Sequence, residues 1–147
     1  MKNQVVYLFK LFGGYKTMKT IKITFTRKEI SSLTMCCELT SYKLYNNIVD
    51  SNNSVVQYIL EDNANMLSAF RSMTEQILFN KKCTRKSIEA TDYMWRCIMF
   101  YCTYEIKTIV EDLGKFITDK YVCISDRLYL DNLYTIITKI KTTLSPE

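Results

Sequence analysis

A chain of 147 residues that is 48% hydrophobic and 24% charged has the size and composition of one globular domain, which excludes a disordered chain. It contains three glycines and one proline, too few for the many tight turns of a sheet protein, so we expect an all-α fold. Because histidine is absent, the usual Ser-His-Asp and Cys-His groups are excluded, and we expect no enzyme, no metal and no cofactor.

The net charge of +5 arises from 20 lysines and arginines spread along the chain. A nucleic-acid surface would need a basic stripe interleaved with aromatic residues, so we expect solvated helix faces and no nucleic-acid partner. The chain also has six cysteines without a C-x-x-C motif. Cys97 and Cys102 lie in an apolar helical pattern, which favours reduced, buried thiols in a cytosolic protein. Disulfides in a secreted protein remain the alternative.

Residues 1–25 are predicted to be a short extended leader that precedes a helical domain of residues 26–147. The apolar run at 5–12 (VVYLFKLF) is too short to span a membrane and is interrupted by Lys10, so we expect no integral membrane anchor. Residues 20–25 (TIKITF) alternate apolar and polar side chains, which predicts a short strand or an extended arm.

Two capping boxes mark the first helices. Thr26-x-x-Glu29 predicts a helix over about 28–48, and Ser54-x-x-Gln57 predicts that the next helix begins there. Apolar residues then continue at helical spacing to Ile77, with a polar interruption at Asn63. This pattern predicts either one long amphipathic helix or two helices that bend near 65–70.

After a predicted loop at 80–86, residues 88–104 are apolar on nearly all sides, which predicts a buried central helix. An amphipathic helix is expected to continue over 106–121, after an optional kink near 103–105. Ser125 or Asp126 is expected to cap a last helix. Its inward face is predicted to hold Leu130, Leu133, Ile137 and Ile140.

The central segment 92–101 (DYMWRCIMFY) holds the single tryptophan, Trp95, and a charged Arg96 in an apolar run. A buried charge without a partner is costly. The spacing offers one partner within the chain, because Asp92 stands one helical turn before Arg96.

Four segments, in this order, resemble the motifs of the Bcl-2 family of apoptosis regulators. Residues 41–44 (SYKL) resemble the fourth homology motif, and residues 55–66 resemble the third, with Ile59 at the leucine position and Asn63 at the glycine position. The first motif is represented by Arg96, Phe100 and Tyr101, and the second by residues 123–133, where Ile124, Asp126 and Asp131 match. The short loop after the first helix, the missing anchor and the drift of the motifs resemble virus-encoded members from poxviruses and iridoviruses.

This resemblance implies a Bcl-2-like helical bundle around a hydrophobic central helix, in which Phe100 and Tyr101 anchor that helix in the core. It also implies an apoptosis inhibitor of the host cytoplasm, peripheral at mitochondria, that sequesters Bim-like or Bak- and Bax-like proteins. Such proteins bind the amphipathic BH-3 helix in a hydrophobic groove. The implied groove residues are Met66, Phe70, Met73, Ile77, Met94, Trp95, Arg96 and Met99. The resemblance also implies that Arg96 lies at the edge of the groove and pairs with an aspartate of the ligand, which is the alternative to its pairing with Asp92.

Departures from the family pattern leave alternatives open. Ala64 replaces the aspartate of the third motif, and Trp95 stands where the family has glycine, so it either narrows the groove or marks a register shifted by one residue. The methionine and phenylalanine stripe fits a simple core equally well. An exposed groove also favours a homodimer that covers it. The other functions considered are a viral immune modulator of the same fold without BH-3 binding, and a secreted cytokine-like bundle.

Overall fold

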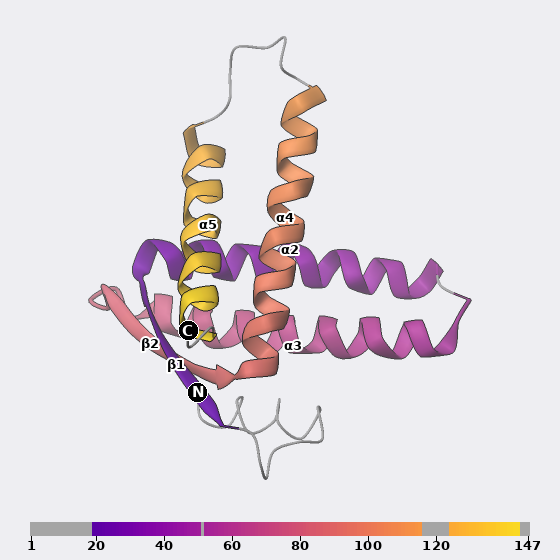
Figure 1. Ribbon diagram of the computed structural model, residues 1–147, viewed down its shortest axis with the longest axis horizontal. Coiled ribbons are helices and arrows are strands. Elements are labelled where there is room, and N and C mark those ends of the chain that lie inside the picture. Colours follow the sequence, from indigo (N-terminus) through magenta and orange to yellow (C-terminus); the bar gives the residue numbers. More distant parts are fainter. Residues whose placement is uncertain (1–18, 51, 116–123, 145–147) are drawn as a thin grey trace.

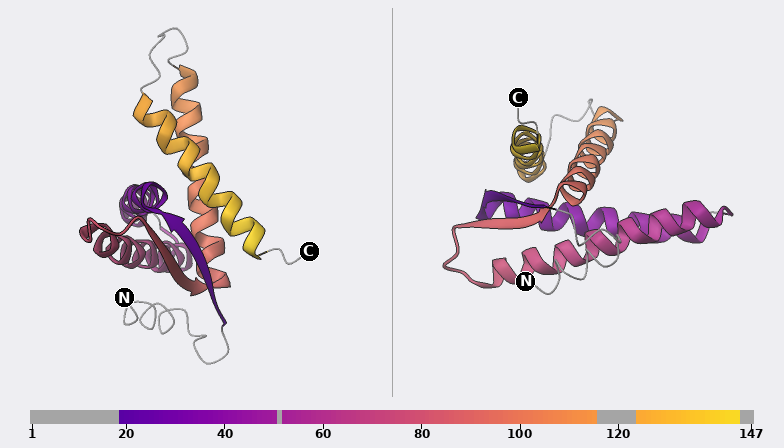
Figure 2. Two further views of the ribbon diagram at one scale, coloured as in Figure 1. Left: turned by 90° about the vertical axis from the view of Figure 1, so that its left-hand side faces the viewer. Right: turned by 60° about the horizontal axis from the view of Figure 1, so that its bottom comes forward.

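The computed structural model describes residues 19–50, 52–115 and 124–144, and these form two strands and four helices. In chain order they are β1 (Thr20–Thr26), α2 (Arg27–Asp50), α3 (Ser54–Phe79), β2 (Arg85–Thr91), α4 (Asp92–Lys115) and α5 (Ile124–Leu144). Helices α2 and α3 lie side by side in one layer, while α4 and α5 form a second pair that crosses them steeply (Figures 1 and 2). The fold is thus mostly helical, as the composition predicts.

The strand predicted at 20–25 is confirmed, but its partner was not foreseen. β1 and β2 form an antiparallel sheet in which Thr20 pairs with Thr91 and Ile23 with Ile88. The prediction of a loop followed by a helix beginning at Ile88 was therefore wrong. Ile88 and Ala90 are buried while Ser87 and Glu89 are exposed, which is the two-residue period of a strand. The central helix α4 begins only at Asp92.

The sheet belongs to the packed domain. Ile23 and Phe25 of β1 are buried in the main hydrophobic cluster, although the sequence placed them in a separate leader. The rest of that leader, residues 1–18, lies outside the described residues. Lys139 of α5 donates to the Thr24 carbonyl at 3.1 Å and lies 5.6 Å from the centre of the Phe25 ring. Both contacts hold α5 against the strand.

The start of α2 agrees with its predicted capping box. The Thr26 amide donates to Glu29 Oε1 at 2.8 Å, and the Glu29 amide donates to Thr26 Oγ1 at 3.3 Å. Lys139 Nζ donates to the same carboxylate oxygen at 2.6 Å. Burial raises the pKa of Glu29, but the bonds from Lys139 and Thr26 outweigh it and hold the pKa below its usual value.

The start of α3 corrects the second capping box. The N-cap is Asn53, whose side-chain oxygen accepts from the amides of Val55 at 2.9 Å and Val56 at 3.2 Å, so Ser54 is already helical. The helix then runs unbroken, without a bend into two. At its other end the guanidinium of Arg27 donates to the carbonyls of Leu78, Asn80 and Cys83, which satisfies groups that a helix end leaves unpaired.

The later helices follow the predicted pattern in part. Helix α4 is continuous through residues 103–105, and the predicted extension to 121 passes beyond the described residues at 116–123. In α5, Leu133 and Ile140 are buried as expected and Leu130 and Ile137 are partly buried, while Ile136 is an additional core residue. Within the described parts of the chain, no helix combines the length and apolar character that crossing a membrane requires.

Trp95 lies where the sheet and two helices meet. Its side chain is fully buried, with ring centres 5.8 Å from Phe25 of β1 and 5.6 Å from Phe70 of α3. Its indole Nε1 donates to the Ile21 carbonyl of β1 at 2.9 Å, which satisfies the polar group of a buried indole. A single side chain on α4 therefore connects β1 and α3.

We expect Trp95→Ala to lower the free energy of unfolding by about 3–5 kcal/mol, because it leaves a large cavity in the core. Trp95→Phe keeps a ring but removes the bond to Ile21, so a loss of about 1–2 kcal/mol is expected. Urea unfolding measures both. Tyr134→Ala is the control, because Tyr134 is an exposed aromatic residue of α5 and its loss should change stability by less than about 0.5 kcal/mol. If Trp95→Ala and Tyr134→Ala unfolded at the same urea concentration, Trp95 would not be the core residue described here.

Candidate functional site

Most of the residues that the resemblance placed in a groove lie in the core instead. The buried ones are Met66, Phe70, Met73, Ile77, Met94 and Trp95. They form the side of α3 that faces the rest of the protein and the first turn of α4, where apolar side chains lose contact with water on packing. In this structure they do not line an open groove. Trp95 in particular fills the core and does not narrow a binding surface.

The remaining two predicted residues are accessible. Met99 is partly buried against the core cluster, and the side chain of Arg96 is 58% exposed. Arg96 Nε forms an ion pair with Asp92 Oδ1 one helical turn earlier, which is the internal pairing that the spacing allowed. The charge is therefore not buried, and its position among apolar residues carries little desolvation cost.

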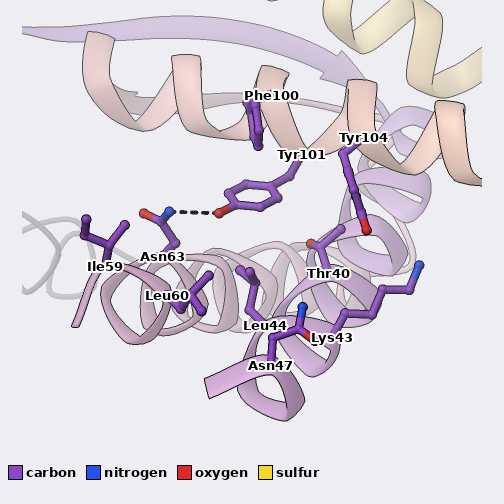
Figure 3. A pocket seen from close by; sticks show the side chains of 10 residues that line it. All are labelled: Thr40, Lys43, Leu44, Asn47, Ile59, Leu60, Asn63, Phe100, Tyr101 and Tyr104. Atoms are coloured by element: carbon purple, nitrogen blue, oxygen red, sulfur yellow. Dashed lines mark hydrogen bonds between the residues drawn. The ribbon is translucent and has the colours of Figure 1, made fainter. Parts of the chain in front are cut away.

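A hollow of about 390 Å³ opens between α2, α3 and α4, at a place that the predicted groove list did not include. We call it the α2–α3–α4 pocket. Its lining residues are Thr40, Lys43, Leu44, Asn47, Ile59, Leu60, Asn63, Phe100, Tyr101 and Tyr104. Figure 3 shows α4 passing over the pair of helices α2 and α3, with side chains from all three directed into the space between them.

The floor of this pocket is fixed by one hydrogen bond between α3 and α4. Asn63 Nδ2 donates to the hydroxyl of Tyr101 at 2.8 Å (Figure 3). Tyr101 is buried, as predicted for an anchor of the central helix, and burial raises the pKa of its hydroxyl while the bond from Asn63 opposes that rise. Asn63 interrupts the apolar stripe of α3 because it meets a polar group of α4 at this point.

The rim of the pocket exposes large apolar side chains. Phe100 is 63% exposed, which corrects the prediction that it anchors α4 in the core, and Ile59 and Tyr104 are also exposed. Arg96, Phe100 and Tyr104 recur every four residues, so they form one stripe along the outer side of α4. Exposed apolar side chains beside a hollow are typical of surfaces that bind another molecule.

The resemblance and the pocket share residues. Leu44 comes from the segment similar to the fourth motif, Ile59 and Asn63 come from the third, and Phe100 and Tyr101 come from the first. The resemblance marked these positions as motif residues, but it did not predict that they line one pocket. The four-residue spacing of Arg96, Phe100 and Tyr104 could have predicted that these residues share one side of the helix. The crossing of α4 over α2 and α3, which creates the hollow, could not be read from spacing.

An ion pair between α2 and α4 lies beside the pocket. Lys43 Nζ is 3.8 Å from Glu105 Oε1, and the carboxylate is almost fully buried while the lysine is 40% exposed. The other oxygen, Glu105 Oε2, has no hydrogen-bond partner among the described atoms. Burial raises the pKa of Glu105, and Lys43 offsets only part of this rise.

Two buried thiols, those of Cys36 and Cys102, lie near the Lys43–Glu105 ion pair. Cys36 and Cys102 lie with their sulfur atoms 3.8 Å apart, and the contact with Cys36 together with burial raises the pKa of Cys102. The described cysteines are free thiols, and Cys123 lies outside the described residues. Thiols whose pKa is raised are poor nucleophiles, so this cluster acts as packing. Among the residues that the structure describes, no cluster of acidic and cysteine side chains is arranged to hold a metal ion.

No protein-family model, curated protein or solved structure matches this chain. The pocket, its exposed rim and the charges beside it are the features of the described residues that bear on function.

Because the pKa of Glu105 is raised, its contribution to the stability of the fold should fall as the pH rises. A carboxyl group whose pKa is higher in the folded than in the unfolded chain stabilises the fold most below the unfolded value of about 4.5, and this contribution is lost as the pH rises through the folded pKa. Glutamine stays neutral at every pH, so the Glu105→Gln variant does not lose this stability. The difference in free energy of unfolding between the variant and the parent chain should therefore grow, in favour of the variant, between pH 4.5 and pH 7.

Urea unfolding at a series of pH values measures this difference. Glu111→Gln is the matched control, since it makes the same charge change at an exposed position of α4. Its unfolding curve should stay parallel to that of the parent chain. A Glu105→Gln difference that does not grow with pH would show that the buried carboxylate is not strained by its burial.

Proposed function

We propose that this protein binds an amphipathic helix of a partner protein in the α2–α3–α4 pocket. The observation that carries the proposal is an apolar hollow formed by three helices and bordered by exposed Phe100, Tyr104 and Ile59. A pocket of this size takes the side chains of a helix, not a whole helix. The ligand would lie along the rim and insert apolar anchors at i, i+3 or i+4, and i+7.

The charges on the rim define the ligand further. Arg96 lies one turn before Phe100 on the outer side of α4 and is exposed, so its guanidinium is accessible to a carboxylate of the ligand. Such a carboxylate would compete with Asp92 for the guanidinium. Lys43, on the α2 side of the pocket, is a second cationic group. The preferred ligand therefore has an apolar face flanked by an acidic residue.

A BH-3 helix has this chemistry, and the resemblance of four segments to Bcl-2 motifs makes it the first partner class to test. On this proposal the protein is an apoptosis inhibitor in the cytoplasm of a virus-infected host cell, where it sequesters Bim-like or Bak- and Bax-like proteins. The Bcl-2-like architecture is part of the proposal. It is supported by α4, which contacts α2, α3 and α5, while the two-stranded sheet departs from an all-helical bundle.

Calorimetry with Bim-like and Bak-like BH-3 peptides tests the proposal. Phe100→Ala should weaken binding by about 2 kcal/mol, the scale for an aromatic residue at the centre of an interface. Tyr134→Ala, an exposed aromatic change on α5, is the control and should leave the affinity unchanged. Absence of binding to the parent chain, or equal effects of the two variants, would overturn the proposal. Light scattering of the free protein shows whether it forms the homodimer that the exposed apolar rim favours.

Arg96→Ala should weaken a BH-3 peptide by about 0.5–1 kcal/mol. The effect is expected to be modest because the guanidinium is exposed and loses its pair with Asp92 when it binds the ligand. Asp92→Asn removes that competitor and should strengthen binding slightly. Replacing the peptide's aspartate with asparagine should abolish the difference between Arg96→Ala and the parent chain. A difference that persists with the neutral peptide would exclude the charge pair.

A further inference from the structure

The outer edge of β2 is a strand edge without a neighbouring strand. The sheet of the described residues has two strands, and β1 covers one side of β2. The amide of Arg27 donates to the Thr84 carbonyl at 2.9 Å in the same register as the sheet, so Thr84 and every second residue after it bond to β1. The amides and carbonyls of Arg85, Ser87 and Glu89 therefore point away from β1.

The opposite edge of the sheet, on β1, is already occupied. The Thr26 amide donates to Glu29 Oε1 at 2.8 Å, and the Thr24 carbonyl accepts from Lys139 Nζ at 3.1 Å. Side chains from the first turn of α2 and from α5 thus satisfy backbone groups of β1 that point away from β2. Among the described residues, β2 is therefore the strand at which the sheet can be extended.

The outward backbone groups of β2 have no comparable partners. No hydrogen bond from the described residues reaches those of Ser87 and Glu89, and both residues are exposed. The Arg85 carbonyl accepts only a thiol hydrogen bond from Cys83 at 3.4 Å, which is a weak donor. Besides β1, the element that β2 contacts most is α4, which continues the chain after Thr91. An unpaired strand edge of this kind can bind a further strand.

The charges of this edge favour one pairing of two copies of the chain. In an antiparallel pair of two β2 strands centred on Ser87, Arg85 stands opposite the partner subunit's Glu89, and the symmetry repeats this pair. Centring the pair on Arg85 or on Glu89 would instead set like charges opposite each other, which is destabilising. Charged side chains often block pairing at a strand edge, but these favour the register centred on Ser87.

We propose that the outer edge of β2 is a dimerisation site, at which two copies of this chain join their sheets into one continuous sheet. Arg85 with the partner subunit's Glu89, the two Ser87 residues, and Glu89 with the partner subunit's Arg85 would each exchange two backbone hydrogen bonds. The residues that line the α2–α3–α4 pocket lie on other elements, so this dimer does not use the pocket or its rim. The inference is independent of the proposed function.

Charge reversal with rescue tests this register. Sedimentation velocity of the parent chain at about 0.1 mM should show a dimer, because small interfaces commonly bind in the micromolar range. Arg85→Glu and Glu89→Arg should each raise the Kd of the dimer about tenfold, since each sets like charges opposite each other at two places. Glu111→Arg, a charge reversal at an exposed position of α4, is the matched control and should leave the Kd unchanged.

The rescue is an equimolar mixture of the Arg85→Glu and Glu89→Arg chains. It should regain the Kd of the parent chain, because each opposed pair in the mixed dimer then joins opposite charges. A chain that carries both substitutions should dimerise equally well. A monomeric parent chain, equal effects of all three reversals, or a mixture that dimerises no better than the single variants would overturn the inference.

Amide hydrogen exchange locates the interface without any substitution, so it decides the inference even if a variant fails to fold. The amides of Ser87 and Glu89 should exchange more slowly as the protein concentration rises, because dimerisation pairs them. The amide of Ile88 is the internal control, since it already bonds to β1 and its exchange should change little. Protection that grows with concentration around Phe100 but not at Ser87 would place the dimer at the rim and overturn the inference.

Discussion

The fold depends on how Trp95 is held. Its indole is packed between Phe25 and Phe70 and donates to the Ile21 carbonyl, so the first turn of α4 is joined to the sheet and to α3 at once. That joint sets the angle at which α4 leaves the sheet and crosses α2 and α3 (Figure 1). Further along, α4 contacts α2 through Cys102 and Glu105 and α3 through Tyr101, and the pocket lies between these three helices.

Helix α4 has two faces that differ in burial. Its inner face places Met94, Trp95, Ile98 and Tyr101 in the core, where the burial of apolar surface stabilises the domain. Its outer face carries Arg96, Phe100 and Tyr104, which are accessible and contribute little to the packing of the described residues. The two faces meet at Tyr101, whose hydroxyl accepts from Asn63 at the floor of the pocket. A ligand in this pocket would therefore contact a surface held rigid by the core beneath it.

The pKa values of two buried carboxylates, Glu29 and Glu105, are shifted in opposite directions. Glu29 accepts hydrogen bonds from Thr26 and Lys139, which lower its pKa in spite of burial and tie α2 to α5. Glu105 has one distant partner, Lys43, and one oxygen without a partner, so burial dominates and its pKa is raised. Glu29 therefore stabilises the fold in its ionised form. Burial of ionised Glu105, beside the pocket, costs free energy. Perturbed carboxylates of this kind occur both at functional sites and in structural ion-pair networks.

The sequence by itself determined the mostly helical class, the capping box at Thr26 and the burial of Leu133 and Ile140 in α5, and it offered the pairing of Arg96 with Asp92 as one of two alternatives. These features are local, because they depend on residues within one or two turns of each other. Only the tertiary structure decided that residues 85–91 form a strand, since a strand needs its partner, and β1 lies far away in the sequence. It likewise decided which apolar residues are core and which line a pocket. The stripe from Met66 to Ile77 and the aromatic pair Phe100 and Tyr104 both carry large apolar side chains at helical spacing, but only the first is covered by neighbouring elements. Burial is a property of the packed arrangement and not of the spacing.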